Sequence, residues 1–279
     1  MTIYNQENCI QRQTEHKQMK KEKDFRRERK FEEYEDSANV TAGRNSVREL
    51  LASGRDIDKV FVQKGERTGS ITVLIAEARA RSIPVVECEK AKLDRLSGGI
   101  NHQGIAAFAA EKEYCEVDDI IAYAAEKNEK PLIVIADKIE DPHNLGALIR
   151  AAECAGAHGI IIPKRKGAML TQVVSKASAG AMEHMRIAKV TNLAVTVDEL
   201  KEKGLWIFAA EAGGESFYEQ DMTCAAAIIL GSEGKGVSKL LLDKCDFVLS
   251  IPMYGRVNSF NVAAATAVIL CEAARQRHS

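Results

Sequence analysis

Five short, almost continuous apolar runs recur in the second half of this chain, and they limit its fold more than any other feature. Stretches with helical spacing of apolar residues separate them. Strands that are apolar on both faces belong to a parallel sheet covered by helices on each side. We therefore predict a doubly wound α/β domain over residues 131–279, with strands at "PLIVIAD" (131–137), "GIIIP" (159–163), "LWIFAA" (205–210), "AAAIIL" (225–230) and "FVLSIP" (247–252).

Residues 37–113 alternate helical and extended patterns at shorter spacing. The patterns predict a compact α/β/α unit, joined to the second domain by a helical linker over residues 114–130. Its expected helices are "GRNSVRELLASG" (43–54), "SITVLIAEARARS" (70–82) and "AKLDRLSGG" (91–99), and its expected strands are "DKVFVQ" (58–63), "IPVVEC" (83–88) and "GIAAFAA" (104–110).

Residues 1–36 are crowded with charges of both signs and hold few large apolar side chains. Such a segment cannot bury much surface. We expect a charged, flexible arm, which either contacts RNA through "KQMKKEKDFRRERK" (17–30) or serves only as a solubilising tail.

Charge and cysteine usage exclude several classes of protein. The formal net charge of −1 argues against a wholly basic nucleic-acid coat, although it is compatible with a local basic face. No apolar run approaches the roughly 18 residues that cross a bilayer, and the N-terminal segment has no apolar signal core, so we expect a cytoplasmic protein. Seven widely spaced cysteines without a CxxC pair indicate reduced, mostly buried thiols and no metal site.

The glycine-rich stretch "LGSEGKGVS" (230–238) follows a predicted strand and opens a helix. Such turns usually bind anions through backbone N–H groups, yet Glu233 lies in the middle of this one. A Walker loop is excluded because Gly236, not Ser or Thr, follows Lys235. A dinucleotide site is disfavoured, since it would place its glycines after the first strand of the domain.

Two other stretches carry polar residues at the ends of predicted strands. In "DPHNLGALIRAAECAG" (141–156), Asn144 is a good helix cap, and Arg150 is expected near a packed helix surface. The simpler alternative for Arg150 is a surface ion pair with Glu153. In "SIPMYGRVNSFNVAAATAVIL" (250–270), Ser259 or Asn261 begins a long apolar helix, and either residue could be no more than its N-cap.

These three stretches, in this order at the end of the chain, resemble the three motifs of the SpoU/TrmH branch of the SPOUT RNA methyltransferases. The segments "NVTAGRNSVRELLASGRDIDKVFV" (39–62) and "GGINHQGIAAF" (98–108) resemble the substrate-binding domain that precedes the catalytic domain in many members. The resemblance covers residues 37–279 and is greatest to the RlmB-like group, which methylates a guanosine ribose in 23S ribosomal RNA.

The resemblance implies a deep trefoil knot in the carboxy-terminal half, S-adenosyl-L-methionine as cofactor, 23S ribosomal RNA as substrate and a homodimer. It implies that Arg44, Arg48 and the "NHQG" loop (101–104) supply RNA affinity. It also assigns a set of site residues. The expected cofactor-binding residues are Gly231, Ile251 and Phe260, and the expected catalytic residues are Asn144, Arg150, Glu233, Ser259 and Asn261.

The implied cofactor accounts for Glu233, because a carboxylate is tolerated beside a sulfonium cation and would be repelled by a phosphate. The alternative is that Glu233 caps the helix that follows. Two positions depart from the family pattern: Phe260 stands where Leu is expected, and Ala263 where many members have Ser.

Two other functions stay open. One is a transfer RNA ribose methyltransferase of the same family, which the amino-terminal unit disfavours because the minimal tRNA enzymes lack it. The other is a non-catalytic RNA-binding assembly factor, which the intact set of polar motif residues disfavours.

Overall fold

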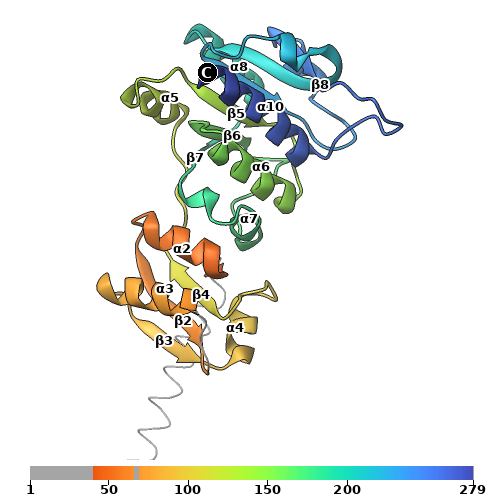
Figure 1. Cartoon of the computed structure of the whole chain (residues 1–279). Coiled ribbons are helices and arrows are strands. Elements are labelled where there is room, and N and C mark those ends of the chain that lie inside the picture. Colours follow the sequence, from red (N-terminus) through yellow and green to blue (C-terminus); the bar gives the residue numbers. More distant parts are fainter. Residues whose placement is uncertain (1–39, 66–68, 279) are drawn as a thin grey trace, which may run out of the picture. The chain divides into compact units, whose positions relative to one another are not determined.

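The computed structural model describes residues 40–65 and 69–278, so the charged arm predicted over residues 1–36 lies outside the described part (Figure 1). Within that part, no helix is both long enough and apolar enough to cross a membrane. Two separate sheets organise the described residues.

The first sheet has four strands in the order β1-β4-β2-β3, and three helices accompany it. β2 and β3 pair in parallel, whereas β4 runs antiparallel to β1 and β2. The expected helices and strands are all present. β1 was not predicted, because a strand of three residues is too short to show a periodicity. The elements are β1 (Val40–Ala42), α2 (Arg44–Ala52), β2 (Ile57–Gln63), α3 (Gly69–Ala80), β3 (Val85–Cys88), α4 (Lys90–Leu96) and β4 (Ile105–Ala109).

The two faces of this sheet bury different sets of side chains. Val60 and Val62 share an apolar cluster with residues of α2 and α3. Phe61 lies between them in sequence and therefore on the opposite face, where its ring meets Phe108 edge-on at 5.2 Å. Leu93 of α4 is fully buried. The predicted α/β/α layering is therefore confirmed.

The second sheet has six parallel strands in the order β10-β8-β9-β5-β6-β7. Each of the five predicted runs forms a strand, and β7 is the one that the pattern missed. The strands are β5 (Leu132–Ala136), β6 (Gly159–Pro163), β7 (Arg186–Val190), β8 (Trp206–Ser216), β9 (Ala226–Leu230) and β10 (Phe247–Ser250).

Helices cover both faces of this sheet, as the doubly wound prediction required. Leu132 and Val134 belong to one buried cluster with residues of α6 and α10, whereas Ile133 and Ile135 belong to another with residues of α8. Figure 1 shows α6 beside α10, the two helices that pack on the face with Leu132 and Val134. The helical elements are α5 (Val117–Glu126), α6 (Pro142–Cys154), α7 (Gln172–Ala177), η1 (Ala181–Glu183), α8 (Leu193–Glu202), η2 (Phe217–Glu219), α9 (Lys239–Leu242) and α10 (Val262–Arg277).

The small residues of α6 allow a close approach, as the sequence suggested. A Cβ added at Gly146 would lie 2.4 Å from the Cβ of Ala177 and 2.8 Å from the carbonyl oxygen of Val174, both in α7. Since such distances are below van der Waals contact, only glycine fits there. The close packing of α7 fixes the direction of α6, which begins at the carboxyl end of β5.

Chain order and spatial order diverge at β5, since β6 and β7 lie on one side of it and β9, β8 and β10 on the other. In open α/β sheets, ligands bind outside the carboxyl ends of the strands at such a switch point. The loops that follow β5, β9 and β10 carry all three sequence motifs, so the fold directs the search for a site to this edge.

Candidate active site

The loop after β9, residues 231–238, folds back on itself. A Cβ at Gly231 would lie 2.0 Å from the carbonyl carbon of Gly236 and 2.2 Å from the nitrogen of Val237. Gly236 donates a backbone hydrogen bond to Ser232 O at 2.9 Å, and both Gly234 and Gly236 have positive φ. The glycines are therefore required by the closure of the loop, independently of any ligand.

Two carboxylates from the strands on either side of β9 hold this loop. The buried Asp137, at the end of β5, accepts the Ser238 N–H at Oδ2 over 2.7 Å. Glu211 of β8 accepts the Val237 N–H at Oε2, also over 2.7 Å. Sequence reasoning missed both residues, although an acidic residue directly after a buried strand was a readable signal for Asp137.

Asn261 joins the three motif loops. It is the N-cap of α10, since its Oδ1 accepts from Ala263 N at 3.0 Å. Its Nδ2 donates to Asn144 Oδ1 at 3.0 Å and also contacts Glu233 Oε1. Asn261 is thus both a helix cap and the polar centre of the site, so the two alternatives for it do not exclude each other.

The expected cap at Asn144 was wrong, and so was the alternative of a capping role for Glu233. Asp141, not Asn144, is the N-cap of α6, and its carboxylate accepts from His143 N, because Pro142 begins the helix two residues before Asn144. Glu233 does not cap the helix that follows: the N-cap position of α9 is Ser238, and its side chain makes no capping bond.

A cavity of about 770 Å³ opens between the loops after β9 and β10 (residues 231–236 and 251–261), the carboxyl end of β8 and the first turns of α10. The glycine loop lines one part of it, and Leu249, Val262 and Ile269 form part of an apolar side. The predicted site residues that line it are Gly231, Glu233, Ile251, Ser259, Phe260 and Asn261.

This cavity fits an adenosyl compound. Its volume is in the range of small-ligand and cofactor pockets, and its lining combines apolar side chains with a glycine-rich loop. Phe260 is 47% exposed and can cover an adenine ring. The carboxylates at Glu211 and Glu233 are compatible with a cationic ligand.

Arg150 does not line this cavity. It is exposed, so its expected place near a packed surface was wrong: α6 buries Leu145, Gly146, Leu148, Ile149 and Ala152 instead. Six residues separate Arg150 from Asn144, which turns it by about 120° around the helix axis and moves it about 9 Å along it. Within the described residues no ion pair with Glu153 forms, so the simpler alternative also fails.

A basic loop lies next to the segment that leads from β5 into α6, the helix that carries Asn144. Lys164, Arg165 and Lys166 follow β6 in succession, and all three are exposed. Ala168 N donates to Ile139 O at 2.8 Å and so ties this loop to the segment between β5 and α6. The run of three cations was readable in the sequence, but its place beside the segment between β5 and α6 was not.

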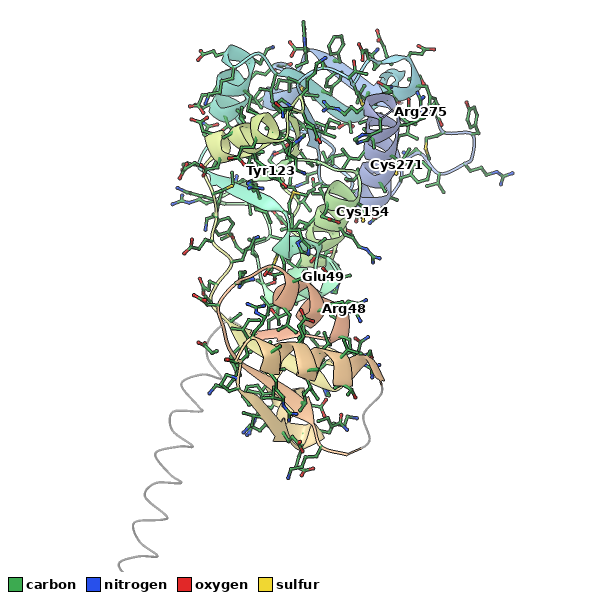
Figure 2. The ribbon with its side chains drawn as sticks, turned by 60° about the vertical axis from the view of Figure 1, so that its left-hand side comes forward. Arg48, Glu49, Tyr123, Cys154, Cys271 and Arg275 are labelled. Atoms are coloured by element: carbon green, nitrogen blue, oxygen red, sulfur yellow. The ribbon has the colours of Figure 1, made fainter. Side chains whose placement is uncertain are left out.

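The described thiols are all free, but they are less buried than expected. Cys88 is buried, whereas Cys154 on α6 and Cys271 on α10 are exposed (Figure 2). Burial raises the pKa of the Cys245 thiol to about 12, which leaves it unreactive. Among the described residues no three or more His, Cys, Asp or Glu side chains gather in a way that could hold a metal ion.

Comparison with known proteins now decides the family. Residues 131–271 match the SpoU rRNA methylase family, and residues 42–115 match the RNA 2'-O ribose methyltransferase substrate-binding domain. The chain belongs to the SpoU family. It is 44% identical over 241 residues to a "Putative TrmH family tRNA/rRNA methyltransferase" of Staphylococcus haemolyticus, covering 86% of this chain and 96% of that protein. A Bacillus subtilis relative with the same description, YacO, is 42% identical over 85% of this chain and 95% of its own length.

Solved structures show the same fold. The crystal structure of an RNA 2'-O ribose methyltransferase superposes on this protein with a TM-score of 0.71 at 26% identity. The superposition covers 86% of this protein and 89% of the other. The SpoU methyltransferase AviRb from Streptomyces viridochromogenes, solved with the cofactor AdoMet, has a TM-score of 0.71 at 22% identity, over 86% and 90% of the two chains. The fold is therefore that of the SPOUT methyltransferases.

The SpoU family chain is an S-adenosylmethionine-dependent RNA ribose 2'-O-methyltransferase. The family descriptions and the solved RNA 2'-O ribose methyltransferase agree on this activity. AviRb was solved with AdoMet, and the cavity beside the glycine loop suits the chemistry of that cofactor. The deep knot that the resemblance implies stays a prediction.

Proposed function

We propose that this enzyme methylates the ribose 2'-hydroxyl of a guanosine in 23S ribosomal RNA, in the cytoplasm. The observation that carries the proposal is the four-stranded unit that precedes the six-stranded sheet in the sequence, which matches a family substrate-binding domain over residues 42–115. Minimal tRNA enzymes of the family lack such a unit. The names of the relatives cover both tRNA and rRNA, so the choice of rRNA rests on this unit and on the motif resemblance.

The cofactor would lie in the cavity beside the glycine loop, held by Gly231, Ile251 and Phe260. When bound, S-adenosylmethionine supplies a methyl group made electrophilic by the sulfonium that carries it. The backbone of the glycine loop would hold the polar groups of the adenosine, and Phe260 would cover its base. Glu233 would favour the positive charge and keep the Asn261 amide in place, a role consistent with their contact.

A ribose hydroxyl is a poor nucleophile until it begins to lose its proton. We assign to Arg150 the stabilisation of the negative charge that forms on the 2'-oxygen, and to a phosphate or water the acceptance of the proton. An arginine is a poor base because its pKa exceeds about 12. The polar groups that orient the ribose would come from Asn144, Ser259 and Asn261. Ser259 is more important here because Ala263 has no hydroxyl group.

A homodimer would explain why Arg150 lies outside the cavity of its own chain. After α10 has packed on its own domain, Ala264 and Cys271 stay exposed and Ala267 and Val268 are half-buried, which leaves a second apolar face. α6 packs beside α10, so Arg150 lies on a helix next to that face. We propose that a second copy covers the face with two-fold symmetry and brings Arg150 of one copy to the cavity of the other.

The cations at 164–166 support an RNA substrate. They are exposed beside the segment between β5 and α6, where phosphates of a bound RNA would pass. Their replacement by alanine should weaken RNA binding and leave cofactor binding unchanged.

The test of the substrate is methyl transfer from labelled S-adenosylmethionine to unmodified RNA. Purified full-length enzyme would be given 23S RNA and transfer RNA, both isolated from a strain that lacks the enzyme, in separate reactions at equal nucleotide concentration. We expect about one methyl group per 23S molecule and background incorporation into tRNA. Incorporation into tRNA alone would replace the proposed substrate, and incorporation into neither would favour the non-catalytic assembly factor.

A further inference from the structure

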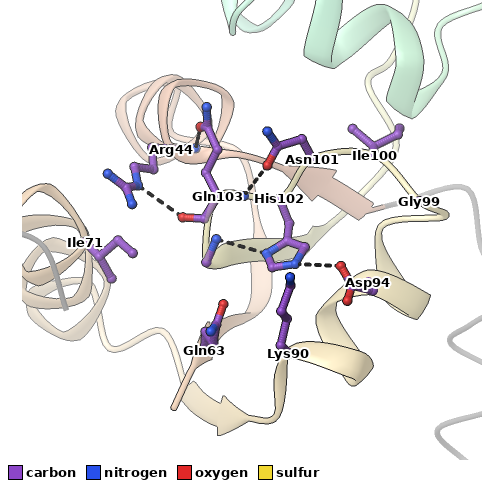
Figure 3. A pocket seen from close by; sticks show the side chains of 11 residues that line it. Arg44, Gln63, Ile71, Lys90, Asp94, Gly99, Ile100, Asn101, His102 and Gln103 are labelled. Atoms are coloured by element: carbon purple, nitrogen blue, oxygen red, sulfur yellow. Dashed lines mark hydrogen bonds and ion pairs between the residues drawn. The ribbon is translucent and has the colours of Figure 1, made fainter. Parts of the chain in front are cut away.

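A second cavity lies within the four-stranded unit (Figure 3). It shares no lining residue with the cavity beside the glycine loop. Its volume is about 430 Å³, and it opens between the start of α2, the start of α4 and the loop from Gly98 to Gly104. Two cations, Arg44 and Lys90, and one carboxylate, Asp94, line it together with carboxamides, a histidine and two isoleucines.

The buried His102 fixes one wall of this cavity. Its Nδ1 accepts the Gly104 N–H at 2.9 Å, so its Nε2 carries the proton and donates to Asp94 Oδ1 at 3.0 Å. The loop it anchors has positive φ at Gly98, Gly99, Gln103 and Gly104. A loop with this many unusual backbone angles, tied to α4 by a buried ring, is preorganised.

Arg44 is held in place but keeps donors for a ligand. Its Nε donates to the carbonyl oxygen of Gln103 at 3.1 Å, and its Nη1 donates to Ser70 Oγ at 3.3 Å. A guanidinium has five N–H donors, so three remain. Within the described residues neither Arg44 nor Lys90 forms an ion pair, and one Asp94 oxygen is engaged by His102.

The other lining groups suit a nucleobase. Ile71 and Ile100 provide apolar surface, and the side chains of Gln63 and Gln103 each carry both a donor and an acceptor. The Gln103 Oε1 accepts from Arg44 N at 3.0 Å, which leaves its NH₂ group available. Apolar walls, amides at the edge and unpaired cations at the rim together match the three parts of a nucleotide: base faces, base edge and phosphate.

We propose that this cavity binds one unpaired nucleotide of the RNA substrate. Arg44 and Lys90 contact its phosphate, Ile71 and Ile100 contact its base, and Gln63 and Gln103 contact the base edge. A paired base cannot enter such a cavity without leaving its helix, so the site selects loops or bulges over duplex. The inference rests on the proposed function only in that RNA is the ligand, and it adds a site that reads an unstacked base.

The test compares two RNA probes on the full-length chain. A fluorescein-labelled stem–loop with an eight-nucleotide unpaired loop is set against a fully paired duplex of the same length, and affinity is measured by anisotropy at several salt concentrations. We expect the stem–loop to bind more tightly. Lys90→Ala and Ile100→Ala should each weaken stem–loop binding roughly five- to tenfold and leave duplex binding nearly unchanged.

The salt dependence of binding distinguishes the ionic contact of Lys90 from the apolar contact of Ile100. Lys90→Ala should lower the slope of log affinity against log salt by about 1, because one phosphate contact is lost, and Ile100→Ala should leave the slope unchanged. Arg79→Ala is the matched control, since Arg79 is an exposed cation on α3 outside the cavity. A thermal melt of each variant checks the fold.

Three outcomes would overturn the proposal: equal binding of stem–loop and duplex, no loss in Lys90→Ala and Ile100→Ala, or displacement of the stem–loop by micromolar guanosine monophosphate, which would make a free nucleotide the ligand. Methyl transfer is measured separately. A chain that prefers the stem–loop but methylates no RNA would contradict the proposed function and leave the cavity assignment standing.

Discussion

At the scale of single residues, Asn261 shows what a sequence can and cannot say. Its place before a long apolar helix predicted an N-cap, and its oxygen does cap α10. Its amide nitrogen meets Asn144, 117 residues earlier in the chain. No local pattern encodes that pairing, so only the motif resemblance pointed to it.

Arg150 is the residue whose role can be tested most sharply. If it stabilises the forming alkoxide, Arg150→Ala should slow single-turnover methylation about a hundredfold or more, equivalent to roughly 3 kcal/mol. Arg150→Lys should also fail, because a point charge does not reproduce the planar fork. Cofactor affinity and melting temperature should hardly change, because Arg150 is exposed and outside the cofactor cavity.

The control for Arg150 is Glu153→Ala on the same helix. It should leave turnover and stability within about 0.5 kcal/mol of the parent, because no ion pair joins the two side chains. Near-normal turnover in Arg150→Ala would move the search to Glu233 and Ser259.

His158 makes the stability of the methylase domain depend on pH. Burial lowers its pKa, although Glu129 opposes the shift, and its Nδ1 accepts the Leu132 N–H at 3.0 Å. The unfolded chain therefore takes up the proton first as pH falls. The stability that the neutral ring contributes is complete above about pH 6.5 and is lost as pH falls from there toward the lowered pKa.

The check is the midpoint of urea unfolding at pH 7.5 and at pH 5.5. The parent chain should lose more stability over this interval than His158→Asn, whose amide oxygen still accepts the Leu132 N–H but takes up no proton. Equal losses in both proteins would show that His158 is not the group responsible.

At the scale of elements, apolar runs predicted strands well wherever both faces of the strand are buried. They missed β7 because this edge strand reads "RIAKV", with charges at positions 186 and 189, and they missed β1 because it has three residues. The bonds that hold the glycine loop were beyond any local pattern. Asp137 and Ser238 are 101 residues apart, and the sheet order that brings them together was not predicted.

The glycine loop gives the prediction at this scale. In Gly231→Ala the new methyl group would lie 2.0 Å from the carbonyl carbon of Gly236, so the loop must open. We expect S-adenosylmethionine affinity to fall at least about tenfold and stability to fall by about 1–3 kcal/mol. Calorimetry and a thermal melt measure the two effects.

Gly255→Ala is the matched control in the neighbouring loop, since a Cβ there would meet nothing within 4 Å and its φ is not positive. It should bind the cofactor as the parent does. Normal binding by Gly231→Ala would mean that the loop does not shape the cofactor site.

At the scale of the whole molecule, the proposed dimer can be tested by mixing inactive variants. Arg150→Ala keeps an intact cavity, and Gly231→Ala keeps an intact Arg150. If Arg150 serves the cavity of its partner, refolding the two together should restore methylation to about a quarter of the parent's rate. Light scattering should give twice the mass of one chain. A monomer mass at every concentration, or no restored activity, would contradict the shared site.

The most direct test of the central claim is the chemical identity of the methylated nucleoside. After reaction with 23S RNA and labelled S-adenosylmethionine, the RNA is treated with alkali, which spares only the phosphodiester next to a 2'-O-methyl group, because the blocked oxygen cannot attack the phosphorus. Mass spectrometry then identifies the protected dinucleotide. Our account predicts a single 2'-O-methylguanosine, absent when Arg150→Ala replaces the parent enzyme. A methyl group on a base, or on the ribose of another nucleoside, would contradict it.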